Sequence, residues 1–181
     1  MSVREFAEDV GSERSLVAAA RLGDRDAFES LVEPQRRGVH MHCYRMTGSI
    51  TDADDMLQES LLKAWRRLDT FEHRAPFRAW LYKVATNVCL NELAARARPR
   101  FSVGREWSGG PPPLAEIEHL QPYPDRLIDD AVDPAARFDR KESIELAFIA
   151  AIQLLPPRQR AVLLLRDVLA WSAREVADSL E

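Results

Sequence analysis

The fold is decided by residues 51–91, which read TDADDMLQESLLKAWRRLDTFEHRAPFRAWLYKVATNVCLN. We expect a first helix to open at Thr51, because Thr51 and Asp54 have the spacing of a capping box. At about 100° per residue, one face of this helix is apolar and carries Leu57, Leu61, Ala64 and Leu68. The opposite face is a polar strip with a leucine in it, made of Asp55, Gln58, Glu59, Leu62 and Arg66.

A second helix is expected to start at Pro76 or Phe77, because proline suits the first turn of a helix. Its apolar stripe is made of Trp80, Leu81, Val84, Ala85 and Val88. Between the two helices lies an aromatic and basic turn, Phe71-Glu72-His73-Arg74-Ala75. The sequence therefore predicts two packed helices whose connection carries both an aromatic ring and positive charge.

Charge is unevenly distributed along the chain. The formal net charge is -4, which taken alone argues against a nucleic-acid partner. Residues 63–105, however, hold ten basic and three acidic residues, so this segment carries +7 and the remainder carries -11. Such asymmetry suits a local phosphate-binding face on a protein whose acidic remainder discourages indiscriminate binding.

Residues 52–71 (DADDMLQESLLKAWRRLDTF) and 77–91 (FRAWLYKVATNVCLN) resemble region two of the bacterial sigma-70 family, in its extracytoplasmic-function (ECF) branch. The resemblance implies a specificity subunit of RNA polymerase, with no catalytic chemistry of its own and no cofactor. In the commonest family pattern, small and acidic residues follow the phenylalanine of the turn. Here Glu72-His73-Arg74-Ala75-Pro76 follows it, so the resemblance does not imply a promoter preference.

The resemblance also implies which residues bind the partners. The polar strip of the first helix would bind the clamp helices of the largest polymerase subunit, through Asp55, Gln58, Glu59, Leu62 and Arg66. The turn and the second helix would open the minus-ten element of promoter DNA, which requires rings that receive unstacked bases and cations that hold the backbone. The implied DNA-binding residues are Phe71, Arg74, Arg78, Trp80, Tyr82, Lys83, Asn87 and Asn91. Among them, Phe71 and Asn87 match the positions that shape a pocket for a flipped base, whereas the spacing of Trp80 makes it a core residue first. An anti-sigma factor is a further candidate partner.

The residues before this stretch are expected to complete the same helical module, over residues 12–98. Ser12 to Arg21 has the pattern of a helix that is stopped by Gly23. Asp24 can cap the next helix, and Gly48 ends it.

Residues 99–138 are expected to form a linker, since seven of the eleven prolines lie in it. Helical spacing returns over residues 139–181, with a break at Pro156-Pro157. Ser172 and Glu175 have the spacing of a capping box for one more short helix.

Residues 155–178, LPPRQRAVLLLRDVLAWSAREVAD, resemble region four of the same family, where a helix-turn-helix reads the upstream promoter element. The resemblance therefore implies an all-α fold of two small modules, a region-two bundle and a partial region four, joined by the Pro/Gly-rich linker. In the family, the helix matching residues 173–180 supports the recognition helix, which follows a turn that would start about where Glu181 ends.

Composition and residue types bear on location and metal binding. No apolar run reaches the roughly 20 residues that span a bilayer, and the first ten residues lack the apolar core of a signal peptide, so we expect a cytoplasmic protein without membrane contact. Cys43 and Cys89 are expected to be reduced core residues. His40, His42 and Cys43 lack a fourth ligand at workable spacing, so no metal is expected.

Two other functions compete with the sigma-factor interpretation. Asp52-Ala-Asp54-Asp55, with Glu59 one turn on, resembles the proton-donating motif of terpenoid cyclases, and such carboxylates can hold Mg²⁺. No second carboxylate-rich helix is predicted to face them, and the chain is short for a closed helical cavity, so we expect no enzyme. The stronger competitor is a helical DNA-binding regulator that works without polymerase; co-purification with core RNA polymerase separates the two.

Base-specific upstream contacts are expected to be missing, because a helix-turn-helix takes them mostly from its second helix. Arg158, Arg160, Arg166 and Arg174 can contact phosphates, which position a protein without specifying sequence. We expect these 181 residues to bind minus-thirty-five duplex no better than scrambled duplex, with binding that falls as salt rises. Fluorescence anisotropy at two salt concentrations tests this; a preference of about tenfold would place the recognition element within these residues.

Overall fold

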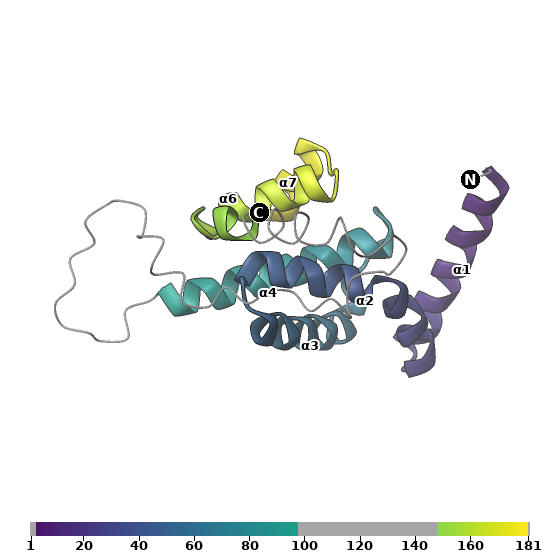
Figure 1. The fold of residues 1–181 in the computed structure, drawn as a ribbon. Helices are drawn as coiled ribbons and strands as arrows, with labels where there is room; N and C mark the ends of the chain where they lie inside the picture. Colours follow the sequence, from purple (N-terminus) through teal and green to yellow (C-terminus); the bar gives the residue numbers. More distant parts are fainter. Residues whose placement is uncertain (1–2, 98–147, 181) are drawn as a thin grey trace, which may run out of the picture.

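The computed structural model describes residues 3–97 and 148–180, with side chains from residue 12 onward in the first range. All regular structure in these two ranges is helical, which confirms the predicted all-α class. The predicted linker at 99–138 and the start of the second module lie outside the described residues. Figure 1 shows the C-terminal helices lying along one side of the N-terminal bundle, opposite α3.

α1 (Val3–Arg21) and α2 (Arg25–Thr47) are joined by a tight turn. Gly23 has φ 95° in this turn, a left-handed conformation that glycine adopts without steric cost. Asp24 caps α2, because its carboxylate accepts hydrogen bonds from two backbone N–H groups of the first turn, at 3.0 and 3.1 Å. The predicted stop at Gly23 and cap at Asp24 are confirmed, whereas α1 begins well before Ser12, the predicted start.

α3 (Ile50–Arg66) follows a sharp turn that ends α2. Gly48 has φ 75°, and its N–H bonds a carbonyl one turn back at 2.7 Å, so α2 ends where predicted. Ser49 is extended, and its hydroxyl accepts a hydrogen bond from the Asp52 N–H at 3.2 Å. The predicted cap at Thr51 is therefore wrong. Ser49, directly after the reversing glycine, has the extended backbone of a cap, and Thr51 already lies inside the helix.

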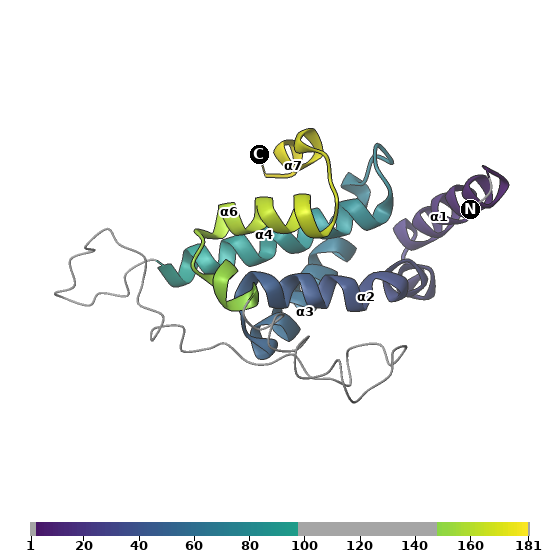
Figure 2. The ribbon, with the colours of Figure 1, turned by 45° about the horizontal axis from the view of Figure 1, so that its top comes forward.

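A short 3-10 turn, η1 (Leu68–Thr70), follows α3, and residues 71–76 connect it to α4 (Phe77–Ala97). α4 thus starts at one of the two predicted residues. It packs against both α2 and α3. In Figure 2, α4 also runs beside the C-terminal helices, so it is the central element of the molecule.

The core of the bundle lies where α2, α3 and α4 meet, and its largest fully buried side chains include Tyr44, Phe77, Met46 and Leu81. Cys43 and Cys89 are free thiols and both are fully buried there. The pKa of Cys43 is raised well above its ordinary value by a hydrogen bond with Cys89 and by burial. Protonated thiols of this kind behave as small apolar side chains.

One buried polar pair joins α2 to α4. The Nε2 atom of His42 lies 2.9 Å from the Thr86 hydroxyl, and that hydroxyl donates to the Tyr82 carbonyl at 2.8 Å. Because a hydroxyl has a single hydrogen, we infer that Nε2–H of His42 is the donor to Thr86. A neutral imidazole satisfies this arrangement, and burial, with a smaller effect of the Arg45 charge, lowers the pKa of His42 to about 4.

The C-terminal module contains a helical segment at 148–153, α6 (Pro157–Leu163), the π-helical turn η4 (Leu164–Val168) and α7 (Ala173–Leu180). Proline opens α6, so the predicted break at Pro156-Pro157 is confirmed.

The predicted capping box before α7 is confirmed as well. The Ser172 hydroxyl accepts from the Glu175 N–H at 3.2 Å, and the Glu175 carboxylate accepts from the Ser172 N–H at 2.7 Å. These hydrogen bonds lower the pKa of Glu175.

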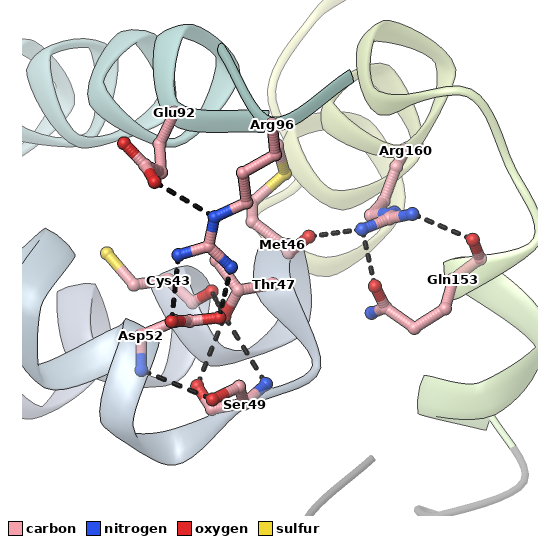
Figure 3. A network of polar contacts seen from close by, with 9 residues as sticks. All are labelled: Cys43, Met46, Thr47, Ser49, Asp52, Glu92, Arg96, Gln153 and Arg160. Carbon is pink, nitrogen blue, oxygen red and sulfur yellow. Dashed lines mark hydrogen bonds and ion pairs between the residues drawn. The ribbon is translucent and has the colours of Figure 1, made fainter. Parts of the chain in front are cut away.

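A buried arginine attaches this module to the end of α2. Arg160 donates to the carbonyl oxygens of Ile152 (3.0 Å), Gln153 (2.8 Å) and Leu155 (3.2 Å), and also to the carbonyl of Met46 in α2. Figure 3 shows this guanidinium between the two modules. Burial lowers the pKa of Arg160 to about 10, so the group stays charged near neutral pH while its hydrogens are paired with carbonyls.

Two further hydrogen bonds cross the same boundary. The Gln153 side-chain amide donates to the Arg45 carbonyl at 2.9 Å, and the Lys83 ammonium donates to the Asp178 carbonyl at 2.5 Å. An added Cβ on Gly48 would lie 3.1 Å from Gln153, tighter than most such contacts. The C-terminal module is therefore seated on the end of α2 and on α4.

The His42–Thr86 pair predicts a pH-dependent stability. The unfolded imidazole takes a proton near pH 6.5 and the folded one only near pH 4, so protons bind the unfolded state preferentially between these values. The contribution of His42 to the free energy of unfolding should fall by up to about 3 kcal/mol as pH drops through this window. Urea unfolding of wild type, His42→Gln and the control His73→Gln tests this. Only His42→Gln should flatten the dependence, and an equally steep curve for it would contradict the burial of a neutral His42.

Candidate functional site

The predicted polymerase-binding strip lies on the outward side of α3. Asp55, Gln58, Leu62 and Arg66 are exposed, and Glu59 is half-buried with its carboxylate 3.1 Å from the Lys63 ammonium. Leu62 is a large apolar side chain with 43% of its surface in solvent. The structure therefore brings all five predicted residues together on one face, whose centre is apolar and whose ends carry opposite charges.

The inward side of α3 differs slightly from the predicted apolar face. Its buried residues are Ala53, Met56, Ser60 and Ala64, while the predicted Leu57 and Leu61 are half-buried. The small residues let the helix approach its neighbours closely. Ser60 fits this apolar face because its hydroxyl donates to the Met56 carbonyl one turn back at 2.5 Å.

Two of the predicted base-stacking rings lie in the core. Phe71 is 2% exposed, with its ring centroid 5.8 Å from Phe77 and 5.5 Å from Trp80. Tyr82 is 3% exposed and packs against the His42 ring at 5.5 Å; burial raises its pKa. In this structure neither ring offers a face to a base. α4 is central and packs against neighbours on more than one side, so both rings are buried in these contacts. The sequence predicted a single apolar stripe on this helix and therefore did not predict their burial.

Trp80 is half-buried, in keeping with its predicted core spacing. It lies within ring-contact distance of Phe71 and of Phe77. Part of its indole is accessible and part supports the turn.

The remaining predicted DNA-binding residues are at the surface in two groups. Arg74 and Arg78 lie at or near the turn: Arg74 is 85% exposed with its guanidinium 2.7 Å from the Glu72 carboxylate, and Arg78 extends over the Tyr82 ring at 5.7 Å. Lys83, Asn87 and Asn91 follow each other at four-residue intervals along α4, so they share a face. Asn87 and Asn91 are exposed, and Lys83 is half-buried beside α7.

Two residues of α1 contact the turn and were not predicted from the sequence. Arg21 donates hydrogen bonds to the carbonyl oxygens of Leu68 and Phe71. The Glu13 carboxylate accepts one from the Phe77 N–H, with both oxygens 3.2 Å from the nitrogen. These partners are separated by about fifty residues or more in sequence, so no local pattern could have indicated them.

Two carboxylates of the alternative Mg²⁺ motif, Asp52 and Asp54, contact basic side chains of the protein. Asp52 binds the Arg96 guanidinium through both oxygens, at 2.7 and 2.9 Å, and Asp54 lies 2.9 Å from Nε2 of His40. Figure 3 shows the Asp52–Arg96 pair, which raises the pKa of Arg96. Within the two described ranges, no three His, Cys, Asp or Glu side chains are grouped so that they could hold a metal ion. Among the helices that are described, none is long and apolar enough to cross a membrane.

Comparison with known proteins matches both modules to families. Residues 31–99 match Sigma-70 region 2, and residues 145–181 match Sigma-70, region 4. The solved structure of CnrH in complex with the cytosolic domain of CnrY is similar, with a TM-score of 0.53 and 25% identity, over 93% of this chain and 82% of that one.

Curated relatives agree. The ECF RNA polymerase sigma factor SigG of Mycobacterium tuberculosis is 44% identical over 99% of this chain, which spans about half (48%) of SigG. SigM of the same organism is 30% identical over 93% of this chain and 74% of its own length, and SigW of Bacillus subtilis is 28% identical over 91% and 82%. The chain therefore belongs to the ECF branch of the sigma-70 family of RNA polymerase sigma factors.

Proposed function

We propose that this chain binds core RNA polymerase and directs it to promoter DNA, where it helps to open the minus-ten element at transcription initiation. The observation that carries the proposal is the pair of opposed faces on α3, one buried in the bundle and one displaying the predicted polymerase-binding strip, in a chain that belongs to the sigma family. No catalytic chemistry is required of it.

The composition of the α3 strip suits a protein partner. An exposed leucine surrounded by polar and charged side chains offers an apolar contact with a polar rim, the usual anatomy of a protein interface. Leu62 supplies the apolar contact, and Asp55 and Arg66 supply charges of opposite sign along the helix. Charges of opposite sign at the two ends of the strip favour one orientation of a bound partner. This supports the clamp helices of the largest polymerase subunit as the partner.

The turn and α4 suit promoter DNA. Arg74 and Arg78 are exposed cations near the turn, where they can contact phosphates, and Lys83 is a further cation on α4. Asn87 and Asn91 are exposed amides that can donate to and accept from a base edge. The buried Phe71 and Tyr82 rings support this surface from beneath, which replaces the stacking role expected of them.

The competing function, a helical regulator that acts without polymerase, has no use for the α3 strip. It would need the DNA-facing residues alone. An anti-sigma factor is a third candidate partner, supported by the likeness to CnrH, whose structure was solved with the cytosolic domain of CnrY.

The α3 strip gives a test of polymerase binding. Asp55→Arg combined with Gln58→Ala should abolish capture of core polymerase and leave the fold intact, because surface substitutions change stability by only about 0.5 kcal/mol each. Asp26→Arg combined with Gln35→Ala makes the same changes on α2 and is the control. Pull-down with purified core polymerase is the measurement. Equal capture by both double variants and wild type would exclude the strip and favour the polymerase-independent regulator.

The aromatic turn gives a second test, because burial and base contact predict different outcomes. Phe71→Ala should lower the free energy of unfolding by about 3–5 kcal/mol, as expected for a buried ring, and so impair promoter opening indirectly. Asn87→Ala should leave stability within about 0.5 kcal/mol of wild type and relax the base preference. Urea unfolding and permanganate footprinting of open complexes measure both. An unchanged urea midpoint for Phe71→Ala would contradict its place in the core.

A further inference from the structure

α1 contacts the start of the aromatic turn through its last residue. Nε and Nη2 of Arg21 each lie 3.3 Å from the Leu68 carbonyl oxygen, and Nη2 also donates to the Phe71 carbonyl. The Leu68 carbonyl also accepts the Phe71 N–H at 3.1 Å, and the Phe71 carbonyl lies at the start of the turn, outside any helix. A guanidinium carries several donors in one rigid plane, so a single side chain can hold two successive backbone points.

α1 also contacts the end of the same turn. Both carboxylate oxygens of Glu13 lie 3.2 Å from the N–H nitrogen of Phe77, the first residue of α4. Helix N-termini expose unpaired N–H groups and favour negative charge. Pro76, which precedes the helix, has no side-chain acceptor. Glu13 therefore does from another helix what a capping serine or aspartate does locally.

The tip of the turn is held differently from its ends. Between the two anchored points, Arg74 is 85% exposed and pairs with its neighbour Glu72, and the His73 ring contacts Phe71 at 4.6 Å. His73 has φ 56°, a left-handed conformation that is uncommon outside glycine. The anchors thus fix where the turn starts and ends, while its tip projects into solvent.

We propose that Arg21 and Glu13 are positioning residues for minus-ten recognition: α1 holds both ends of the aromatic turn, so that the turn and α4 meet an unstacked base in a fixed geometry. This rests on the proposed function. A flexible turn would have to be ordered on binding DNA, which weakens binding and blurs discrimination between bases. Because α1 anchors the turn, the turn loses its conformational freedom when the protein folds and not when DNA binds. Neither residue needs to touch DNA.

Conservative variants separate positioning from simple charge. Arg21→Lys keeps the positive charge but loses the planar fork that reaches two carbonyls, so it should rescue Arg21→Ala only in part. Glu13→Gln loses the charge but keeps an oxygen that accepts from Phe77, so it should retain most of the function lost in Glu13→Ala. Arg14→Ala, an exposed neighbour on α1, is the control.

The experiment uses holoenzyme assembled from core polymerase and the full-length protein, and selects from a single-stranded DNA library randomised over the minus-ten positions. Each variant is also measured for capture of core polymerase and for urea unfolding. We expect Arg21→Ala and Glu13→Ala to capture polymerase as wild type does, and to lose discrimination by about tenfold at the most selective position. Arg14→Ala should select as wild type does, and Glu13→Gln should recover most of the discrimination that Glu13→Ala loses.

The proposal would be overturned if Arg21→Ala and Glu13→Ala selected the wild-type sequence as strongly as wild type does. It would also be overturned if Arg21→Lys restored the full discrimination that Arg21→Ala is expected to lose. Should an alanine variant fail to fold, Arg21→Lys and the remaining alanine variant decide on the same readout. Failure of the proposed function looks different: wild-type protein would then capture no polymerase, or its holoenzyme would select no sequence at all.

Discussion

Two guanidinium groups converge on the turn that joins α2 to α3, and the rest of the structure depends on them (Figure 3). Arg96 from α4 binds both oxygens of Asp52 at the start of α3, and Arg160 from α6 donates to the Met46 carbonyl at the end of α2. Arg96 thus pairs with a carboxylate in the first turn of α3, and Arg160 pairs with a carbonyl in the last turn of α2, where backbone groups lack helical partners. Segments far apart in sequence are thereby fixed at one point, and removing either arginine would break these contacts between them.

Because this turn sets the direction in which α3 leaves α2, it also decides which side of α3 reaches solvent. The strip around Leu62 faces outward as a consequence of packing on the opposite side, where small side chains such as Ala53 and Ala64 are fully buried. α4 has the reverse situation, since it contacts α2, α3 and the C-terminal module together. Its exposed surface is therefore narrow, and its aromatic side chains Phe77, Trp80 and Tyr82 are buried or half-buried.

Local patterns predicted what depends on neighbours in the chain. The reversal at Gly48, the Asp24 cap and the Ser172–Glu175 box all follow from chemistry within a few residues, and the structure has each of them. The predicted cap at Thr51 was wrong because the chain reverses at Gly48, so the extended capping residue is Ser49. Burial of Phe71 and Tyr82, and the contacts of α1 with the turn, depend on which helices become neighbours. Periodicity along one helix identifies an apolar face but not a second partner on another side.

The buried thiols of α2 and α4 give the molecule a reporter of its own motions. Cys43 and Cys89 are its two cysteines, both are inaccessible, and a raised thiol pKa keeps Cys43 in the unreactive protonated form. A soluble alkylating reagent can reach them only when α2 and α4 separate. Under native conditions, the rate at which the thiols are labelled therefore measures how often α2 and α4 separate, without any added probe.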